Sequence, residues 1–159
     1  MNPIALLKVI FFDLGDTLVF KNNSSQWIPH AQRTLHQLQG KGIRLGLISN
    51  TGNLMRPDLL KQLPKDFDLR MFDADLIILS SEAGIEKPRR GIFRLALQRA
   101  KVEPHECLFC DDELHNTLCA QVEGMLTARV RSPTGDQGQS ASDIGGLIEE
   151  LESVGFLHR

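Results

Sequence analysis

Residues 8–18 read Lys8-Val9-Ile10-Phe11-Phe12-Asp13-Leu14-Gly15-Asp16-Thr17-Leu18. Its apolar run ends at a carboxylate, and a turn-forming Gly15 and a second carboxylate follow within three residues. β-Branched and aromatic residues closed by a turn signal predict a fully buried strand. An unpaired carboxylate at the end of such a strand is costly, and in open α/β sheets the carboxyl ends of the strands form the ligand crevice. Asp13 is therefore the first candidate functional residue.

Strand and helix patterns alternate along the rest of the chain. Further strands are expected at 43–48, 76–79, 107–110 and 125–130, and helices at 29–40, 53–63, 92–100, 113–122 and 142–154. Parallel strands need crossover connections, and these are right-handed. The sequence therefore predicts one α/β domain over residues 1–159, with a doubly wound, mainly parallel, five-stranded Rossmann-like sheet and helices on both faces. Residues 19–27 are expected to form a loop or short flap, and residues 132–142 a mobile loop.

The composition is that of an ordinary globular domain. The 159 residues are 42% hydrophobic and 24% charged, and the formal net charge of -2 does not indicate nucleic acid or an anionic membrane surface as a partner. No apolar stretch approaches the length of a membrane span, and the first residues lack the basic start and small-residue cleavage site of a signal peptide. Three cysteines fit reduced thiols in a cytosol, so a cytoplasmic location is expected.

Polar residues follow the predicted strands at their carboxyl ends. Asp13, Ser49 and Asp111 follow three strands directly, and Lys87 lies in the loop after another. Two carboxylates, a hydroxyl and an ammonium at one crevice suit a divalent cation and a phosphoryl group. Asp13 and Asp111 could hold Mg²⁺, whereas Ser49, nearby backbone N–H groups and Lys87 could bind phosphate oxygens. An Asp beside a metal can also act as a covalent nucleophile that forms an aspartyl phosphate.

Four motifs, in order and covering nearly the whole chain, resemble those of the haloacid dehalogenase-like (HAD) hydrolases. They are Asp13-Leu14-Gly15-Asp16-Thr17, Leu47-Ile48-Ser49-Asn50, Glu86-Lys87-Pro88, and the segment from Cys110-Asp111-Asp112 to Gly124-Met125. The resemblance implies a Mg²⁺-dependent phosphohydrolase with Asp13 as the nucleophile that carries the phosphoryl group. It also implies that Ser49, Asn50 and Lys87 bind the phosphate, with Lys87 taking part in catalysis.

The same resemblance implies a set of metal ligands. These are the Asp13 carboxylate, the backbone carbonyl of Gly15 and the Asp111 carboxylate, with Asp112 as a further ligand or in contact with the ligands. Asn116 lies where many family members carry another acidic residue, and an amide at this position could orient a metal-bound water.

Gly15 departs from the family pattern. Family phosphatases usually have an Asp here that protonates the leaving group and then activates water, and such help is worth about 10²–10⁴-fold in rate. Asp16 is one residue off, so its side chain should turn elsewhere. Three interpretations stay open: Asp16, Asp112 or His115 substitutes; turnover is slow; or the chain is a catalytically weakened phosphate-binding or regulatory module. A scaffold that uses only the fold is a further hypothesis.

No cap domain is expected over the site. Only 35 residues separate Asp13 from Ser49, and 37 separate Ser49 from Lys87, and core elements take up most of both gaps. An open site favours a large or macromolecular phosphorylated substrate, or a homo-oligomer in which a neighbouring copy covers the crevice. A phosphorylated small molecule is the other partner expected from the site chemistry.

Cys107 and Cys110, with His115 and Cys119, have a spacing that suggests a zinc site. Positions three apart in a strand point to opposite faces. The first two thiols should therefore diverge, and we expect them to be small core residues.

Overall fold

The computed structural model describes residues 6–131 and 143–159, and in these residues five strands form one parallel sheet. The strands are β1 (Val9–Phe12), β4 (Arg44–Ser49), β5 (Ile77–Leu79), β6 (Cys107–Asp111) and β7 (Leu126–Arg129). Their order is β5-β4-β1-β6-β7, and every neighbouring pair is parallel. β1 is thus the central strand. The predicted five-stranded parallel sheet is confirmed, with strand bounds shifted by one or two residues.

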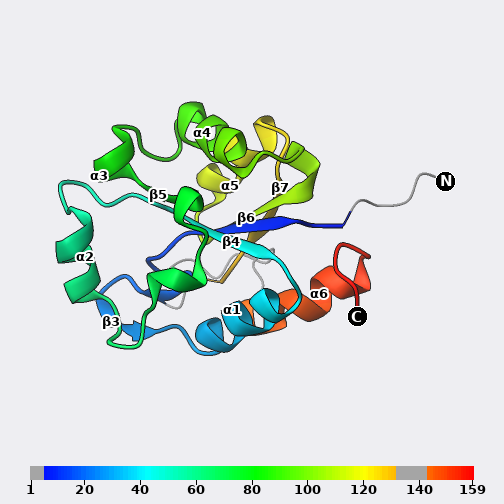
Figure 1. The fold of residues 1–159 in the computed structure, drawn as a ribbon, viewed down its shortest axis with the longest axis horizontal. Coiled ribbons are helices and arrows are strands. Elements are labelled where there is room, and N and C mark those ends of the chain that lie inside the picture. The colour runs from blue at the N-terminus through cyan, green and yellow to red at the C-terminus, as the bar shows by residue number, and fades with distance from the viewer. Residues whose placement is uncertain (1–5, 132–142) are drawn as a thin grey trace.

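Helices cover both faces of this sheet (Figure 1). α1 (Ala31–Gly40) and α6 (Leu147–Ser153) lie on one face, and α4 (Arg90–Ala100) and α5 (Leu114–Val122) lie on the other. Ile10 and Phe12 of β1 pack in the core cluster that includes α1 and α6, whereas Val9 and Phe11 pack in the cluster that includes α4 and α5. A strand buried on both faces needs apolar residues at every position, which explains the continuous apolar run in the sequence.

Short helices fill the connections. They are α2 (Arg56–Gln62), α3 (Ser80–Ala83) and the 3₁₀ helices η1 (Leu69–Met71), η2 (Ala74–Leu76), η3 (Pro104–Glu106) and η4 (Ile144–Gly146). The sequence predicts a loop at 82–88 after β5, and α3 extends into its first two residues, since a single helical turn is too short to show a periodic pattern. The C-terminal helix was predicted as one element, but it begins with η4 before α6. The mobile loop expected at 132–142 lies outside the described residues.

Residues 19–27, which the sequence predicts to be a loop or short flap, form a hairpin. β2 (Val19–Phe20) pairs antiparallel with β3 (Asn23–Trp27). β3 is polar apart from its last residue and therefore lacks the alternating pattern of a half-buried strand. Contacts distant in sequence stabilise it: Ser24 Oγ donates to the Gln62 carbonyl at 2.9 Å, Trp27 Nε1 donates to Asp66 Oδ1 at 2.8 Å, and the Trp27 ring stacks on Phe67 with centroids 5.0 Å apart.

The cysteines of β6 point to opposite faces of the sheet, as the strand period predicts. Cys107 belongs to the core cluster with α4 and α5, and Cys110 belongs to the cluster with α1 and α6. Burial raises the pKa of Cys107 to about 12 and raises that of Cys110 further. In the described part of the chain, no cysteine belongs to a group of three metal-ligating side chains. The two β6 thiols are core residues.

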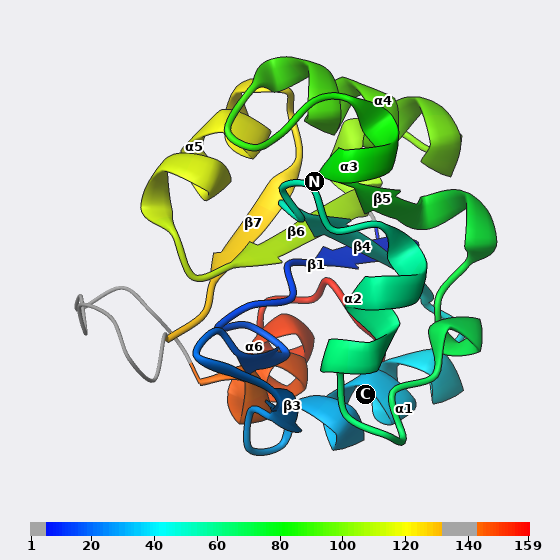
Figure 2. The ribbon, with the colours of Figure 1, turned by 90° about the vertical axis from the view of Figure 1, so that its left-hand side faces the viewer.

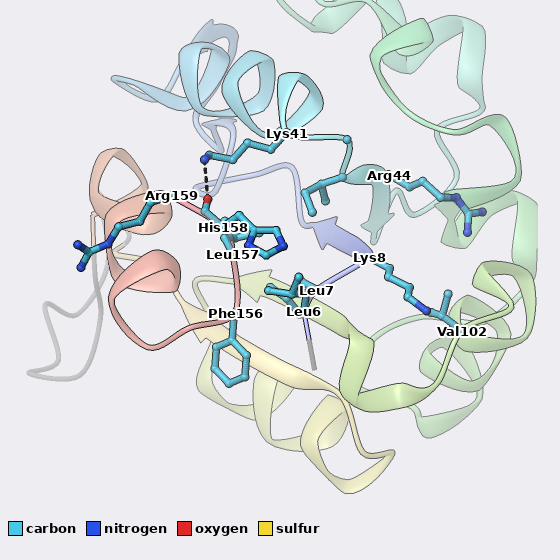
Figure 3. Close-up of a pocket in the computed structure, with 12 residues that line it drawn as sticks. Leu6, Leu7, Lys8, Lys41, Arg44, Val102, Phe156, Leu157, His158 and Arg159 are labelled. Atoms are coloured by element: carbon cyan, nitrogen blue, oxygen red, sulfur yellow. Dashed lines mark hydrogen bonds between the residues drawn. The ribbon is translucent and has the colours of Figure 1, made fainter. Parts of the chain in front are cut away.

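The end of the sheet at which β1, β4 and β6 begin contains a cavity of about 600 Å³ (Figure 3). Its wall is mostly apolar, and three of its four Lys and Arg side chains are engaged in ion pairs: Lys8 with Glu106, Lys41 with Glu152, and Arg44 with Asp73. In Figure 3 Lys41 also donates to the His158 carbonyl, at 2.9 Å. Among the described residues, no helix is long and apolar enough to cross a membrane.

Candidate active site

The carboxyl ends of β1, β4 and β6 meet at a smaller cavity of about 180 Å³. Figure 2 shows the molecule from the side on which the β2–β3 hairpin and α2 lie. The cavity is lined by Asp13, Gly15, Lys21, Ser49, Asn50, Lys87, Asp112, Glu113 and Asn116. Asp111, fully buried at the end of β6, contacts three of these lining residues: Lys87, Glu113 and Asn116. The fold therefore brings together every residue that the sequence predicted for the site.

Lys87 bridges the two carboxylates of this cavity. Its Nζ donates to Asp13 Oδ1 at 2.7 Å and to Asp111 Oδ2 at 2.8 Å. The exposed fractions of the three side chains are 2% for Lys87, 12% for Asp13 and 0% for Asp111. Burial disfavours the ammonium, but its attraction to the two carboxylates and the hydrogen bonds to them outweigh burial and raise the pKa of Lys87 above its ordinary value. This shift favours the charged form of Lys87.

The loop between β6 and α5 fixes Asp111 from its other side. The backbone N–H of Glu113 donates to Asp111 Oδ1 at 2.9 Å, and Asn116 Nδ2 donates to Asp111 Oδ2 at 3.0 Å. The remaining amide oxygen, Asn116 Oδ1, is buried and has no hydrogen-bond partner among the described residues. Buried polar atoms are nearly always satisfied. This acceptor is therefore suited to a water molecule or to a ligand in the cavity.

Three carboxylates lie close enough to share a cation. One oxygen each from Asp13, Asp111 and Asp112 can be chosen so that all lie within 4.8 Å of one another. Three ionised carboxylates and the Lys87 ammonium leave two negative charges, which one divalent cation would offset. An all-oxygen set of this kind fits Mg²⁺.

The surplus negative charge also affects the acidity of the site. Burial and the negative charge of Asp111 raise the pKa of Asp13 to about 6, because together they outweigh the attraction of Lys87, which lowers this pKa. Burial, followed by the charges of Asp13 and Asp111, raises the pKa of Asp112 to about 8. Both carboxyls therefore bind protons more tightly than in an unfolded chain.

The residues predicted to bind phosphate occupy two different positions. Ser49 ends β4 and lines the cavity, where it is 5% exposed. The side-chain amide of Asn50 is engaged with the Lys87 backbone: Asn50 Nδ2 donates to the Lys87 carbonyl at 3.0 Å, and the Lys87 N–H donates to Asn50 Oδ1 at 2.8 Å. Asn50 thus positions Lys87, and its contact with a phosphate stays a prediction.

Gly15 lines the cavity without a side chain to fill it. Of the three residues expected to replace an acid at this position, Asp112 lines the cavity, whereas Asp16 and His115 do not. Asp16 has a φ of 60° and its Oδ1 accepts a hydrogen bond from the Lys21 N–H at 2.9 Å, so its side chain turns elsewhere as expected. His115 is 63% exposed and its Nε2 lies 2.8 Å from Glu113 Oε2.

Lys21 and Glu113 line the cavity but were not predicted. Lys21 lies in the hairpin that was expected to be loop, and nothing in its local pattern marks it. Glu113 was taken as the start of a helix. The run of three acidic residues, 111–113, was the available signal, because a loop that carries two site carboxylates also places the next residue near the site.

Sequence and structure comparisons agree on one family. The sequence model of the haloacid dehalogenase-like hydrolases matches residues 10–130. Haloacid dehalogenase-like hydrolase domain-containing protein 3 of Xenopus laevis is 34% identical over 93 residues, which are 58% of this chain and 36% of that protein. Phosphatase MT3486 of Mycobacterium tuberculosis is 26% identical over 133 residues, which are 84% of this chain and 56% of that protein. The chain thus spans about a third and just over half of these two relatives.

A solved structure has the same fold. The crystal structure of the HAD-hydrolase YfnB of Bacillus subtilis, which is bound to magnesium, matches with a TM-score of 0.74 and 14% sequence identity. The match covers 94% of this chain and 99% of that chain. At this identity the likeness concerns the fold.

Proposed function

Because this chain belongs to the haloacid dehalogenase-like hydrolase family, we propose that it is a Mg²⁺-dependent phosphatase acting through an aspartyl phosphate on Asp13. The observation that carries the proposal is the Lys87 ammonium bridging Asp13 and Asp111 at the cavity, with Asp112 close enough to share a cation. A relative named as a phosphatase supports the reaction, and a similar fold bound to magnesium supports the cation.

The residues of the cavity fit Mg²⁺. The Asp13, Asp111 and Asp112 carboxylates and the backbone carbonyl of Gly15 would hold the cation, and the unsatisfied Asn116 Oδ1 would accept a hydrogen bond from a water beside it. When bound, the cation would offset the charge of the phosphate, so that an anionic nucleophile can approach it.

The protein groups then have defined tasks. The Asp13 carboxylate attacks phosphorus; a bond from Oδ to phosphorus forms, and the bond from phosphorus to the leaving oxygen breaks. Ser49 and the backbone N–H of Asn50 donate to phosphoryl oxygens, and Lys87 keeps its charge beside the transferred group. Water then attacks the aspartyl phosphate, which releases inorganic phosphate and restores Asp13.

Proton supply to the leaving oxygen is the weak part of this scheme. Gly15 has no acid, and neither Asp16 nor His115 lines the cavity. Asp112 cannot hold a cation and carry a proton at once. Glu113, which also lines the cavity, is paired with His115. We infer that solvent supplies the proton, which makes turnover slow for leaving groups that are poor acids. The same observation favours a second candidate function, a weakened phosphate-binding or regulatory module that keeps the metal site.

Release of phosphate from p-nitrophenyl phosphate tests the proposal. We expect the wild-type protein to release phosphate with Mg²⁺ and to stop when EDTA is added. Asp13→Asn should reduce the rate to background, because an amide cannot attack phosphorus. The matched control is Asp75→Asn, which changes an exposed aspartate in η2, at the opposite end of the sheet, and should leave the rate unchanged. Equal rates for Asp13→Asn and the wild type would contradict the proposal.

Binding measurements separate the remaining alternatives. A regulatory module should bind Mg²⁺ and vanadate, a phosphate analogue, without turning over the aryl ester. A scaffold that uses only the fold should bind neither.

A further inference from the structure

A second lysine reaches the candidate active site from the β2–β3 hairpin. Lys21, in the turn between these strands, lines the same cavity as Asp13 and Gly15. Its position is tied to the first motif, because its backbone N–H donates to Oδ1 of the buried Asp16 at 2.9 Å. The hairpin is attached at its other end through Trp27 to Asp66. Lys21 is therefore part of a supported element.

The aliphatic part of Lys21 borders the space in front of Gly15. A Cβ atom built on Gly15 would lie 3.6 Å from both Cβ and Cγ of Lys21. These are ordinary van der Waals distances, so the lysine stem passes directly beside the position that a side chain at residue 15 would enter. At this place the cavity is bordered by a cationic residue.

Lys21 also lies on the outer side of the cavity. Asp13, Ser49 and Lys87 are buried, whereas Lys21 is exposed. In an in-line displacement the leaving oxygen is opposite the attacking oxygen. Because Asp13 attacks from the buried floor, the leaving group points outward, toward the side where Lys21 lies.

The charge of Lys21 is available to a ligand. Lys87 is engaged by Asp13 and Asp111, and Glu113 by His115. None of the ion pairs found within residues 6–131 and 143–159 includes Lys21. A lysine ammonium on a flexible stem is a point charge that can meet a carboxylate or a phosphate at a range of positions.

The geometry points to Lys21 as the residue that binds a second anionic group, a carboxylate or a phosphate, carried by the leaving group of the substrate. The preferred substrates are then phosphomonoesters whose leaving group has its own negative charge. This inference rests on the proposed phosphatase function, since it takes Asp13 as the attacking group. Lys21 itself makes and breaks no covalent bond; it determines specificity.

Two esters that differ in one group test the inference. In 2-phosphoglycolate the leaving group carries a carboxylate, and in ethyl phosphate a methyl group takes its place. We expect Lys21→Met, which keeps most of the stem and removes the charge, to lower kcat/KM for 2-phosphoglycolate about tenfold, the size of one exposed charge-assisted hydrogen bond. The value for ethyl phosphate should stay unchanged. Added KCl should reduce the ratio of kcat/KM for 2-phosphoglycolate to kcat/KM for ethyl phosphate in the wild type. Salt screens the exposed contact between Lys21 and the carboxylate.

Control variants separate charge from other effects. Lys21→Arg keeps the charge and should keep the preference, and Lys21→Gln repeats the loss with a polar side chain. Lys101→Met removes an exposed lysine at the opposite end of the sheet and should change neither ester. Equal losses for the two esters in Lys21→Met, or no loss for either, would overturn the inference.

Calorimetric measurement of the binding of the same two esters in the presence of Mg²⁺ separates failure of this inference from failure of the proposed function. If the wild type releases phosphate from neither ester nor from p-nitrophenyl phosphate, the proposed function fails. Tighter binding of 2-phosphoglycolate than of ethyl phosphate that disappears in Lys21→Met would then still support the role of Lys21. Equal binding of the two esters, or no binding of either, would overturn it.

Discussion

At the scale of single residues, Gly15 decides how the proposed reaction handles its leaving group. It lines the cavity beside Lys21 and has room for a side chain, because its nearest neighbours lie at ordinary contact distance from a Cβ at this position. A carboxyl group here would lie on the side of the leaving oxygen. The lack of an acid at position 15 therefore slows protonation of the leaving oxygen. No steric barrier prevents an Asp side chain from occupying this position.

Gly15→Asp should therefore raise the rate on alkyl phosphates by about 10²-fold, the usual contribution of a positioned general acid. Aryl phosphates, whose leaving groups need little protonation, should gain much less. Steady-state rates on ethyl phosphate and p-nitrophenyl phosphate measure the difference. Gly15→Asn has nearly the same size without the acid and is the matched control. Equal rates for the Asp and Asn variants would show that position 15 takes no part in proton transfer.

Single residues also show how far sequence reasoning reaches into the site. Asp13, Ser49 and Asp111 could be placed together because the carboxyl ends of parallel strands share one edge of the sheet. The place of Lys21 in the site and the pairing of the Asn50 amide with the Lys87 backbone could not be predicted. Both depend on contacts between segments distant in sequence.

At the scale of elements, the β2–β3 hairpin shows what a local pattern misses. β1 was predictable, since burial on both faces makes its sequence continuously apolar. β3 has polar residues at four of its five positions. Its pairing depends on Ser24 contacting the last residue of α2 and on Trp27 contacting the segment after α2. The hairpin that contains Lys21 is thus stabilised by contacts with residues outside the hairpin.

Trp27→Ala should loosen this hairpin. The change removes the hydrogen bond to Asp66 and the stacking on Phe67, and we expect a loss of about 1–2 kcal/mol in the free energy of unfolding. Trypsin should cleave after Lys21 faster in this variant than in the wild type, because the hairpin opens more often. Trp27→Phe keeps the stacking and should fall between the two. Unchanged cleavage after Lys21 in Trp27→Ala would mean that other contacts order the hairpin.

At the scale of the whole molecule, the sheet separates an apolar end from a charged end. The larger of these two cavities, at the end where β1 begins, has mostly apolar walls, and three of its Lys and Arg side chains are in ion pairs. The smaller cavity, where β1 ends, gathers three carboxylates within reach of one cation. We therefore assign the proposed chemistry to the smaller cavity, as expected for a parallel sheet.

Global stability should depend on pH through this charged end. The pKa values of Asp13 and Asp112 are raised from an ordinary 3.8 to about 6 and about 8. The metal-free folded protein then keeps protons that the unfolded chain releases, so its stability falls as pH rises from about 4 to 8. The contribution of Lys87, whose pKa is also raised, is fully present in this window.

Mg²⁺ should reverse this loss, since it binds the ionised carboxylates. We expect a larger rise in Tm on adding Mg²⁺ at pH 8.5 than at pH 5.5, measured by differential scanning calorimetry. Asp111→Asn, which removes one predicted ligand, is expected to reduce the rise at the higher pH. An equal rise at both pH values would argue against a cation held by these carboxylates.

The bridge from Lys87 to Asp13 and Asp111 has a consequence for how a cation arrives. Two mutually repelling carboxylates would separate if nothing lay between them, and each binding event would then have to reorder both side chains. The buried ammonium keeps them together beforehand. The site is thus preorganised: little conformational entropy remains to be lost when the cation enters, and more of its binding free energy is available for affinity.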